Sequence, residues 1–350
     1  MKMLLWTTFI LVAGVVGILS WASYPWSLGR TVKFSSITDV EPQDMIDIEE
    51  HPSVIKLLTF NLGFVYGEGS EGPGYETKDK KYFIERLDKL SEELKGWGAD
   101  IVFLQEIDFA SSRSASINQA EYIARRAGYP YVAEAASWDA NYIPFPYWPL
   151  SRNFGRMLSG GAILSRYPLS EHQVTLLKKP ASSPWWYNLF YLHRYFQKVT
   201  VEVGNKKFNV INLHLEAFDK DNRKDQVREL IQKIKDEDVD FVAGDFNMLP
   251  TSAVKRSKFF NDDNYENDLS FDLMMESGLL EVVPDEIYAK DESLFFTFPA
   301  WAPDRRLDYI FYKMGHKMMK AEVLPSALSD HLPLRASFQI DSPRINPYSQ

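Results

Sequence analysis

The sequence contains no cysteine among its 350 residues. A chain without thiols has no disulfide framework, no thiolate metal site and no cysteine nucleophile. Positive charge is also scarce, because 39 lysines and arginines stand against 48 aspartates and glutamates, for a formal net charge of −9. Proteins that grip nucleic acid need a basic face, so this balance disfavours nucleic-acid binding as the main task, although a local basic groove stays open.

A phosphate-cradling P-loop is also missing from the one glycine-rich stretch. Residues 63–74 are rich in glycine but lack the Gly-Lys-Ser/Thr ending that such a loop requires, so we expect an ordinary loop there. The chain shows no internal repeat. Its length allows one large domain, since two-layer sheet proteins often run to about 250 residues as a single unit.

The N-terminus carries a long apolar run. Residues 3–22 are almost uninterrupted apolar sequence, and about 20 such residues in a helix cross a bilayer core of about 30 Å. A cleaved signal peptide has a shorter apolar region, of about 7–15 residues, before a small-x-small site, which Ser20-Trp21-Ala22 would supply. We therefore expect residues 1–23 to form a signal anchor or transmembrane helix, with cleavage and secretion as the alternative. Either reading places the rest of the chain on the exported side of the cell membrane, periplasmic or extracellular.

The remaining chain divides by composition. Residues 24–52 are expected to be a linker that ends in an acidic run, residues 53–340 a single folded body, and residues 341–350 a C-terminal tail. Apolar patterning in the body predicts strands at Val54–Asn61, 100–106, 160–165, 196–203, 207–213, 239–245, 294–298, 307–313 and Leu334–Gln339, and helices at 81–95, 117–127 and 223–235. The irregular alternation favours an α/β fold with mixed or antiparallel sheets and outer helices over a parallel doubly wound sheet.

Several predicted strands stop at a polar residue. Asn61, Glu106, His214 and Asp245 lie where apolar runs end, and Asn247 follows two residues later. A rigid strand that delivers a polar side chain at its end can position a functional site. Each such residue alone is equally typical of ordinary turn chemistry, so the significance lies in the combination.

Six sequence blocks occur in order: LLTFNLG, FLQEID, INLHLEA, VAGDFNMLP, RLDYIFY and LSDHLPL. Together they resemble the endonuclease/exonuclease/phosphatase superfamily, which includes pancreatic deoxyribonuclease, apurinic endonucleases, neutral sphingomyelinases and inositol-polyphosphate 5-phosphatases. The resemblance runs from about residue 54 to 338. It implies a deoxyribonuclease I-like four-layer α/β/β/α sandwich with two packed mixed β-sheets, and a metal-dependent phosphoesterase activity. The INLHL block is closer to sphingomyelinase-like and deoxyribonuclease-like members than to apurinic endonucleases.

The resemblance also implies a metal centre. Glu106 matches the family's main metal ligand, Asn61 matches the neutral carbonyl ligand beside it, and Asp330 would reach the metal directly or through water. Oxygen donors of this kind suit Mg²⁺, with Mn²⁺ as an alternative.

The catalytic positions come from the same matches. Asp245 resembles the residue that positions or deprotonates the attacking water, and Asn247 would hold a phosphate oxygen through its amide NH₂. His331 and His214 resemble the two histidines that face the phosphate. Asp308 resembles the carboxylate that orients the His331 imidazole.

Two aromatic segments, 138–150 and 185–196, bear on the substrate. Tyr and Trp are favoured at membrane–water interfaces, so these segments either reach into lipid or pack on each other over the sheet. Their nearest phosphate-binding candidates are Arg152, Arg156 and Arg194, and Arg113 is a further candidate. The favoured hypothesis is a sphingomyelinase-like phosphodiesterase with a phospholipid membrane as partner. A secreted or anchored nuclease acting on nucleic acid is the alternative, and a non-catalytic module with the same fold is a third reading.

Overall fold

A computed structural model of the chain describes residues 2–24, 35–43, 48–67, 76–261, 263–288 and 290–340. The helices are α1 (Lys2–Ser23), α2 (Lys80–Trp97), α3 (Gln119–Ala127), α4 (Trp185–Phe190), α5 (Lys220–Glu237), α6 (Ser270–Met275) and α7 (Asp285–Tyr288), with short 3₁₀ turns η2 (Gly63–Val65), η3 (Ser112–Ser114), η4 (Leu150–Arg152) and η5 (Glu292–Phe295). The strands are β1 (Ser35–Asp39), β2 (Val54–Asn61), β3 (Ile101–Asp108), β4 (Tyr131–Ile143), β5 (Gly155–Ser165), β6 (Leu169–Leu176), β7 (Tyr195–Val203), β8 (Lys206–His214), β9 (Phe241–Asp245), β10 (Leu279–Glu281), β11 (Asp308–Lys313), β12 (Lys317–Val323) and β13 (Leu334–Gln339).

The strands form two mixed sheets. One has seven strands in the order β1-β4-β5-β3-β2-β13-β12, and the other has six in the order β10-β11-β9-β8-β7-β6. Strand β2 runs parallel to β3, and β8 runs parallel to β9, while the remaining neighbours are antiparallel. The prediction of mixed sheets is confirmed.

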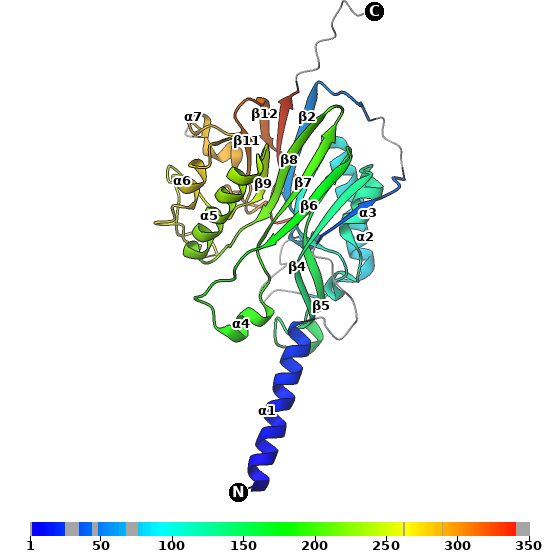
Figure 1. The fold of residues 1–350 in the computed structure, drawn as a ribbon, viewed down its shortest axis with the longest axis vertical. Helices are drawn as coiled ribbons and strands as arrows, with labels where there is room; N and C mark the ends of the chain where they lie inside the picture. Colours follow the sequence, from blue (N-terminus) through cyan, green and yellow to red (C-terminus); the bar gives the residue numbers. More distant parts are fainter. Residues whose placement is uncertain are drawn as a thin grey trace, which may run out of the picture.

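The layers follow from alternating apolar residues. Ile55 and Leu57 of β2 pack against residues of the second sheet such as Phe241, which makes the inner core. Leu58 and Phe60 of the same strand instead pack under α2 and α3. Helices α5 and α6 cover the outer face of the second sheet, so the body is a four-layer α/β/β/α sandwich, as Figure 1 shows.

Helix α1 extends from one end of this sandwich. Within it, Leu5–Ser23 is long enough and apolar enough to cross a membrane, and almost none of that stretch is buried in the body. Figure 1 shows α1 leaving the body beside β4 and β5, at the end where α4 also lies. At the body side, Ala22 is buried.

Six strand segments differ from the sequence-based prediction. The expected strand at 294–298 is wrong, because Glu292–Phe295 forms the turn η5, in which the Asp291 carboxylate accepts a hydrogen bond from the Ser293 N–H at 3.1 Å. Strand β1 lies within the segment expected as a linker and pairs with β4 as an edge strand. Strands β4, β6, β10 and β12 were not predicted: β6, β10 and β12 carry exposed positions that blur the apolar pattern, and β4 is rich in small and polar residues. The predicted loop 63–74 and tail 341–350 lie partly or wholly outside the described residues.

Buried amide side chains connect the two sheets. Gln105 of β3 donates from Nε2 to Asn212 Oδ1 of β8 at 2.7 Å, and Asn212 Nδ2 donates back to the Leu104 carbonyl at 2.9 Å. Gln197 of β7 reaches Asn212 at 3.2 Å and the Ala133 carbonyl of β4 at 2.8 Å. All three side chains are fully buried, so each bond is formed out of water and fixes the sheets in register.

We expect Asn212→Ala to lower the free energy of unfolding by about 2–3 kcal/mol, because it leaves several buried partners without a hydrogen bond. The measurement is a urea titration of the detergent-solubilised full chain, followed by fluorescence. Gln232→Ala removes the same amide group from an exposed position on α5 and should change stability by no more than about 0.5 kcal/mol. Equal effects of the two substitutions would contradict a structural role for the amide connection.

Candidate active site

Period-two alternation aims the polar strand ends into the gap between the sheets. Side chains at odd positions of β2 face the inner core, so Asn61, the last residue, also points inward. The same alternation turns Asp245 inward from β9 and His214 inward from β8, where the two are register neighbours. Asp308 begins β11 directly opposite Asp245 on the antiparallel pair. Four strand termini thus meet at one edge of the sandwich.

Glu106 reaches the same edge by a different route. Simple alternation along β3 would send Glu106 to the helix-covered face, because Leu104 lies there. The pairing of β3 with β5 shifts register between Leu104 and Ile107, and Glu106 has a φ of 50°. A bulge of this kind re-aims a side chain, and the left-handed conformation is strained for a residue with a Cβ. The strained bulge brings the Glu106 carboxylate within 3.8 Å of His214 Nε2.

Asp245 is held on both oxygens. Its Oδ1 accepts from the Asn247 backbone N–H at 3.0 Å, and its Oδ2 accepts from Asn61 Nδ2 at 3.0 Å. Burial raises the pKa of the Asp245 carboxyl to about 6, while the charge of His331 opposes the rise and that of Asp308 adds to it. Asn247 itself has a φ of 51° and donates from its side chain to the Leu215 carbonyl at 3.1 Å.

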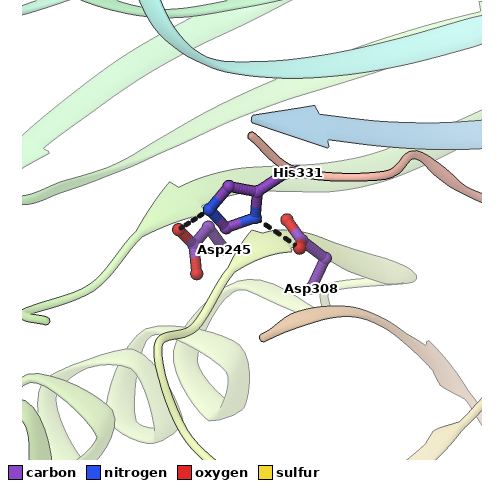
Figure 2. Close-up of side chains that lie close together, drawn as sticks. All are labelled: Asp245, Asp308 and His331. Carbon is purple, nitrogen blue, oxygen red and sulfur yellow. Dashed lines mark hydrogen bonds and ion pairs between the residues drawn. The ribbon is translucent and has the colours of Figure 1, made fainter. Parts of the chain in front are cut away.

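His331 lies between two carboxylates, as Figure 2 shows. Its Nδ1 bonds Asp308 Oδ2 at 2.8 Å, and its Nε2 lies 3.8 Å from Asp245 Oδ2. Burial alone lowers the pKa of His331, but the Asp308 carboxylate, with Asp245 and Asp330, raises it to about 10. At neutral pH the imidazole is therefore a cation, oriented by Asp308 and directed at the cleft.

A second set of contacts joins the end of β2 to the loop that carries His331. The Ser329 hydroxyl donates to the Asn61 carbonyl at 2.7 Å and contacts Asp330 Oδ1 at 3.1 Å. Asn61 Oδ1 accepts from the Gly63 N–H at 3.0 Å. A Cβ at Gly63, whose φ is 49°, would lie 2.7 Å from Asp330 Oδ1, so the close approach of this carboxylate requires glycine.

His214 is restrained by a buried arginine. The Arg194 guanidinium donates to His214 Nε2 and lies 3.7 Å from Glu216 Oε2, which also accepts from the Tyr191 hydroxyl. Burial, together with the charges of Arg194 and His331, lowers the pKa of His214 well below its usual value. The neutral form of this imidazole is therefore favoured, in contrast to His331.

A cleft of about 610 Å³ opens above these groups. Glu106, His214, Asp245, Asn247, Asp330 and His331 all line it. Its walls are largely aromatic and come from the loop after β4, from α4 and from loops of the second sheet: Trp138, Phe145, Tyr147, Phe154, Trp186, Tyr187, Phe190, Tyr191, Phe218, Tyr265, Phe298 and Trp301. Arg194 is the single lysine or arginine among the described residues that line it.

The structure brings all eight sequence-predicted residues together. Six line the cleft, while Asn61 bonds Asp245 and Asp308 bonds His331. Of the three arginines near the aromatic segments that were candidates for binding phosphate, Arg194 lines the cleft. Arg156 pairs with Asp139, and Arg152 is exposed. Arg113 is wrong as a phosphate contact, because it is buried in an ion pair with Asp108 and stacks on Phe64.

Sequence reasoning missed two contributions to the site. The first is the support that Glu216 and Tyr191 give to Arg194, although Glu216 lies inside the INLHLEA block, two residues after His214. The second is the packing of Phe298 against the His331 ring, with ring centroids 4.8 Å apart. No local pattern distinguishes these residues from ordinary core positions.

Two side-chain groups have donors for a metal. The ligand atoms of Asp245, Asp308 and His331 lie within 4.8 Å of one another, but His331 Nδ1 and Asp308 Oδ2 are already bonded to each other. Glu106, Asn61 and Asp330 offer oxygen donors, which hard divalent cations prefer, and Glu106 and Asp330 line the cleft. The donor chemistry of the second group fits a divalent cation better.

Comparison with known proteins agrees with this geometry. A sequence model described as the Endonuclease/Exonuclease/phosphatase family matches residues 58–331, more than three quarters of the chain. No curated protein sequence matches significantly. Members of the family are typically hydrolases of phosphoesters and generally depend on a divalent metal.

Solved structures share the fold at low identity. An endonuclease/exonuclease/phosphatase from Beutenbergia cavernae is 19% identical, with a TM-score of 0.59 over 83% of this chain and 72% of that one. A humanized D. rerio TDP2 is 18% identical, with a TM-score of 0.54 over 83% of this chain and 100% of that one. A mannosyl-6-phosphatase from Bacteroides thetaiotaomicron is 15% identical, with a TM-score of 0.53 over 82% and 100%.

The family model matches residues 58–331, and the matched region contains the strand-end carboxylates and the Asp308–His331 pair. The chain therefore belongs to the endonuclease/exonuclease/phosphatase family.

Proposed function

We propose that the protein is a metal-dependent phosphodiesterase that hydrolyses a membrane phospholipid and is held at the membrane by α1. The observation that carries the proposal is the combination of an acidic and histidine-containing floor with aromatic walls in one cleft. The floor supplies groups for phosphoester hydrolysis. The walls supply apolar contact for the acyl region or backbone of a lipid. Aromatic rings also stack on bases, so the choice between lipid and nucleic acid depends on the charge of the cleft.

The protein side chains provide a consistent set of roles. Asp245, fixed by Asn61 and Asn247, would accept a proton from the attacking water as a general base. His331, oriented by Asp308, would hold the phosphate as a cation. The Asn247 amide and Arg194 would bind non-bridging oxygens, because both offer N–H donors at the cleft.

Glu106, Asn61 and Asp330 would hold the divalent cation in this proposal. Mg²⁺ is the favoured ion, because these donors are all oxygens. When bound, such an ion neutralises charge on the phosphoryl group and stabilises the leaving oxygen.

The charge of the cleft favours a lipid over a nucleic acid. Tracking a nucleic-acid backbone requires a row of lysines and arginines, whereas Arg194 is the one such residue among the described residues of the lining. Glu106, Asp245, Asp263 and Asp330 add negative charge. Nuclease activity is therefore the alternative that the assays below must test.

Metal dependence gives the first test. We expect chelation to abolish hydrolysis of a soluble phosphodiester and Mg²⁺ to restore it. Glu106→Gln keeps the side-chain size but removes a charged ligand, so it should lower activity by at least about 100-fold and raise the Mg²⁺ concentration needed for half-activity. Glu121→Gln on α3, outside the cleft, is the control. An unchanged Mg²⁺ requirement in Glu106→Gln would remove Glu106 as a ligand.

Substrate class gives the second test. We expect the full chain with Mg²⁺ to release water-soluble, phosphate-bearing product from mixed phospholipid liposomes, and His331→Ala to lower the rate by at least about 1,000-fold, because it removes the phosphate-facing cation. Plasmid DNA is assayed with the same preparation. No release from liposomes, together with plasmid nicking that His331→Ala abolishes, would establish the nuclease alternative.

A further inference from the structure

The end of α1 is attached to the body beside the cleft. Asn141 of β4 donates from Nδ2 to the Trp21 carbonyl at 2.8 Å and to the Tyr24 carbonyl at 2.6 Å. The last carbonyls of a helix have no partner within the helix, so Asn141 satisfies groups that would otherwise need water. Ile143, two residues further along β4, lines the cleft. The orientation of the cleft relative to α1 is therefore fixed by a short, hydrogen-bonded connection.

Five large apolar side chains are exposed at this end of the molecule. Tyr147, Trp148 and Leu150 of the β4–β5 connection are 56%, 80% and 64% exposed, and Trp185 and Trp186 of α4 are 71% and 51% exposed. We call these five residues the aromatic rim. Figure 1 shows α4 and the ends of β4 and β5 at the same end of the body as α1. Tyr147 and Trp186 also line the cleft, so the rim borders one side of its mouth.

The length of α1 sets the depth of the rim. The 19 residues Leu5–Ser23 span about 29 Å as a helix, which is close to the thickness of a bilayer core of about 30 Å. With that stretch in the hydrocarbon, the membrane surface lies at Trp21 and Tyr24. Asn141 contacts these two residues, so the neighbouring β4–β5 connection lies at the level of the lipid headgroups.

Charge around the rim matches that position. The β4–β5 connection, residues 144–154, and residues 177–194 around α4 contain no aspartate or glutamate. The same two stretches carry the exposed basic residues Arg152 and Lys178, and the half-buried Lys179. Basic residues beside an interfacial aromatic surface are attracted to lipid phosphates, and acidic residues would be repelled.

We propose that the aromatic rim is inserted in the headgroup region of the bilayer that α1 spans, so that the cleft opens onto the membrane surface and receives lipid directly from it. This inference rests on the proposed membrane anchor. Tyr and Trp place a polar edge in the headgroups and an apolar ring below them, which suits the exposed residues of the rim. The occupant of this surface is the lipid bilayer itself, not a protein partner.

The absence of cysteine makes a direct test available. Trp148→Cys and Asn205→Cys each introduce a single thiol for an environment-sensitive fluorophore. Trp148 is an exposed rim residue, whereas Asn205 lies in the exposed β7–β8 turn. The nine residues of β8 separate that turn from the site by about 27–30 Å. Full-length protein is reconstituted into phosphatidylcholine vesicles containing 20 mol% phosphatidylserine, roughly a physiological anionic share.

We expect the label at position 148 to shift to shorter emission wavelengths and to be quenched by lipids that carry a quencher near the headgroup. The label at position 205 should keep the emission of a water-exposed probe. Water-like emission at both positions in protein that stays in the vesicles through an alkaline carbonate wash would overturn the rim proposal and leave the anchor intact. Loss of the protein from the vesicles in that wash would overturn the anchor and the rim together.

A second measurement uses activity. The double variant Trp148→Ser with Trp185→Ser should lower the ratio of vesicle-lipid hydrolysis to soluble-diester hydrolysis by about tenfold, because each lost ring removes interfacial burial. Asn205→Ser should leave that ratio unchanged. An unchanged ratio in the double variant would contradict a role of the rim in delivering lipid. If neither substrate is hydrolysed by the unmodified chain, the proposed function fails, while the fluorescence result still decides the position of the rim.

Discussion

The site depends on the alternation of side chains along strands that end at the same edge of two packed sheets. The side chains that face the space between the sheets are apolar along most of each strand. They become polar only near the strand end. One step before the end, the amides of Gln105, Gln197 and Asn212 join the sheets. At the end, His214 and Asp245 line the floor of the cleft, and Asn61 bonds Asp245 from below it. The buried amide layer thus supports the chemistry above it, because a shift in register would separate residues that come from different sheets.

Neighbouring charged groups give the two buried histidines opposite charge states. His331 contacts two carboxylates, and Asp308 orients its ring, so the cationic form is favoured despite burial. His214 contacts Arg194, which opposes a second cation, so the neutral form is favoured. Burial lowers the pKa of both imidazoles, which have similar exposure, so the difference in charge state comes from the neighbouring charged groups and not from burial. Environment, more than residue type, therefore assigns separate tasks to like groups.

Much of the fold follows from the sequence, and the departures have physical reasons. The bounds of β2 and β13 agree with the apolar runs, because both strands are buried and end at clear polar positions. The inward direction of Asn61 and Asp245 also follows from simple alternation. The direction of Glu106 does not follow from alternation, because it depends on a bulge in β3 with a strained φ. The sequence around Glu106 does not indicate such a bulge. Arg113 was misread because its partner Asp108 and the ring of Phe64 come together only in the folded chain.

The bond between Asn141 and the end of α1 has a consequence for processing. The small-x-small sequence Ser20-Trp21-Ala22 lies within α1, with Ala22 buried and the Trp21 carbonyl bonded to the body. The folded body holds this sequence as a helix end. Once β4 has formed, cleavage requires the helix end to detach and unwind. In the proposed exported topology, folding of the body before any processing would therefore favour retention of α1.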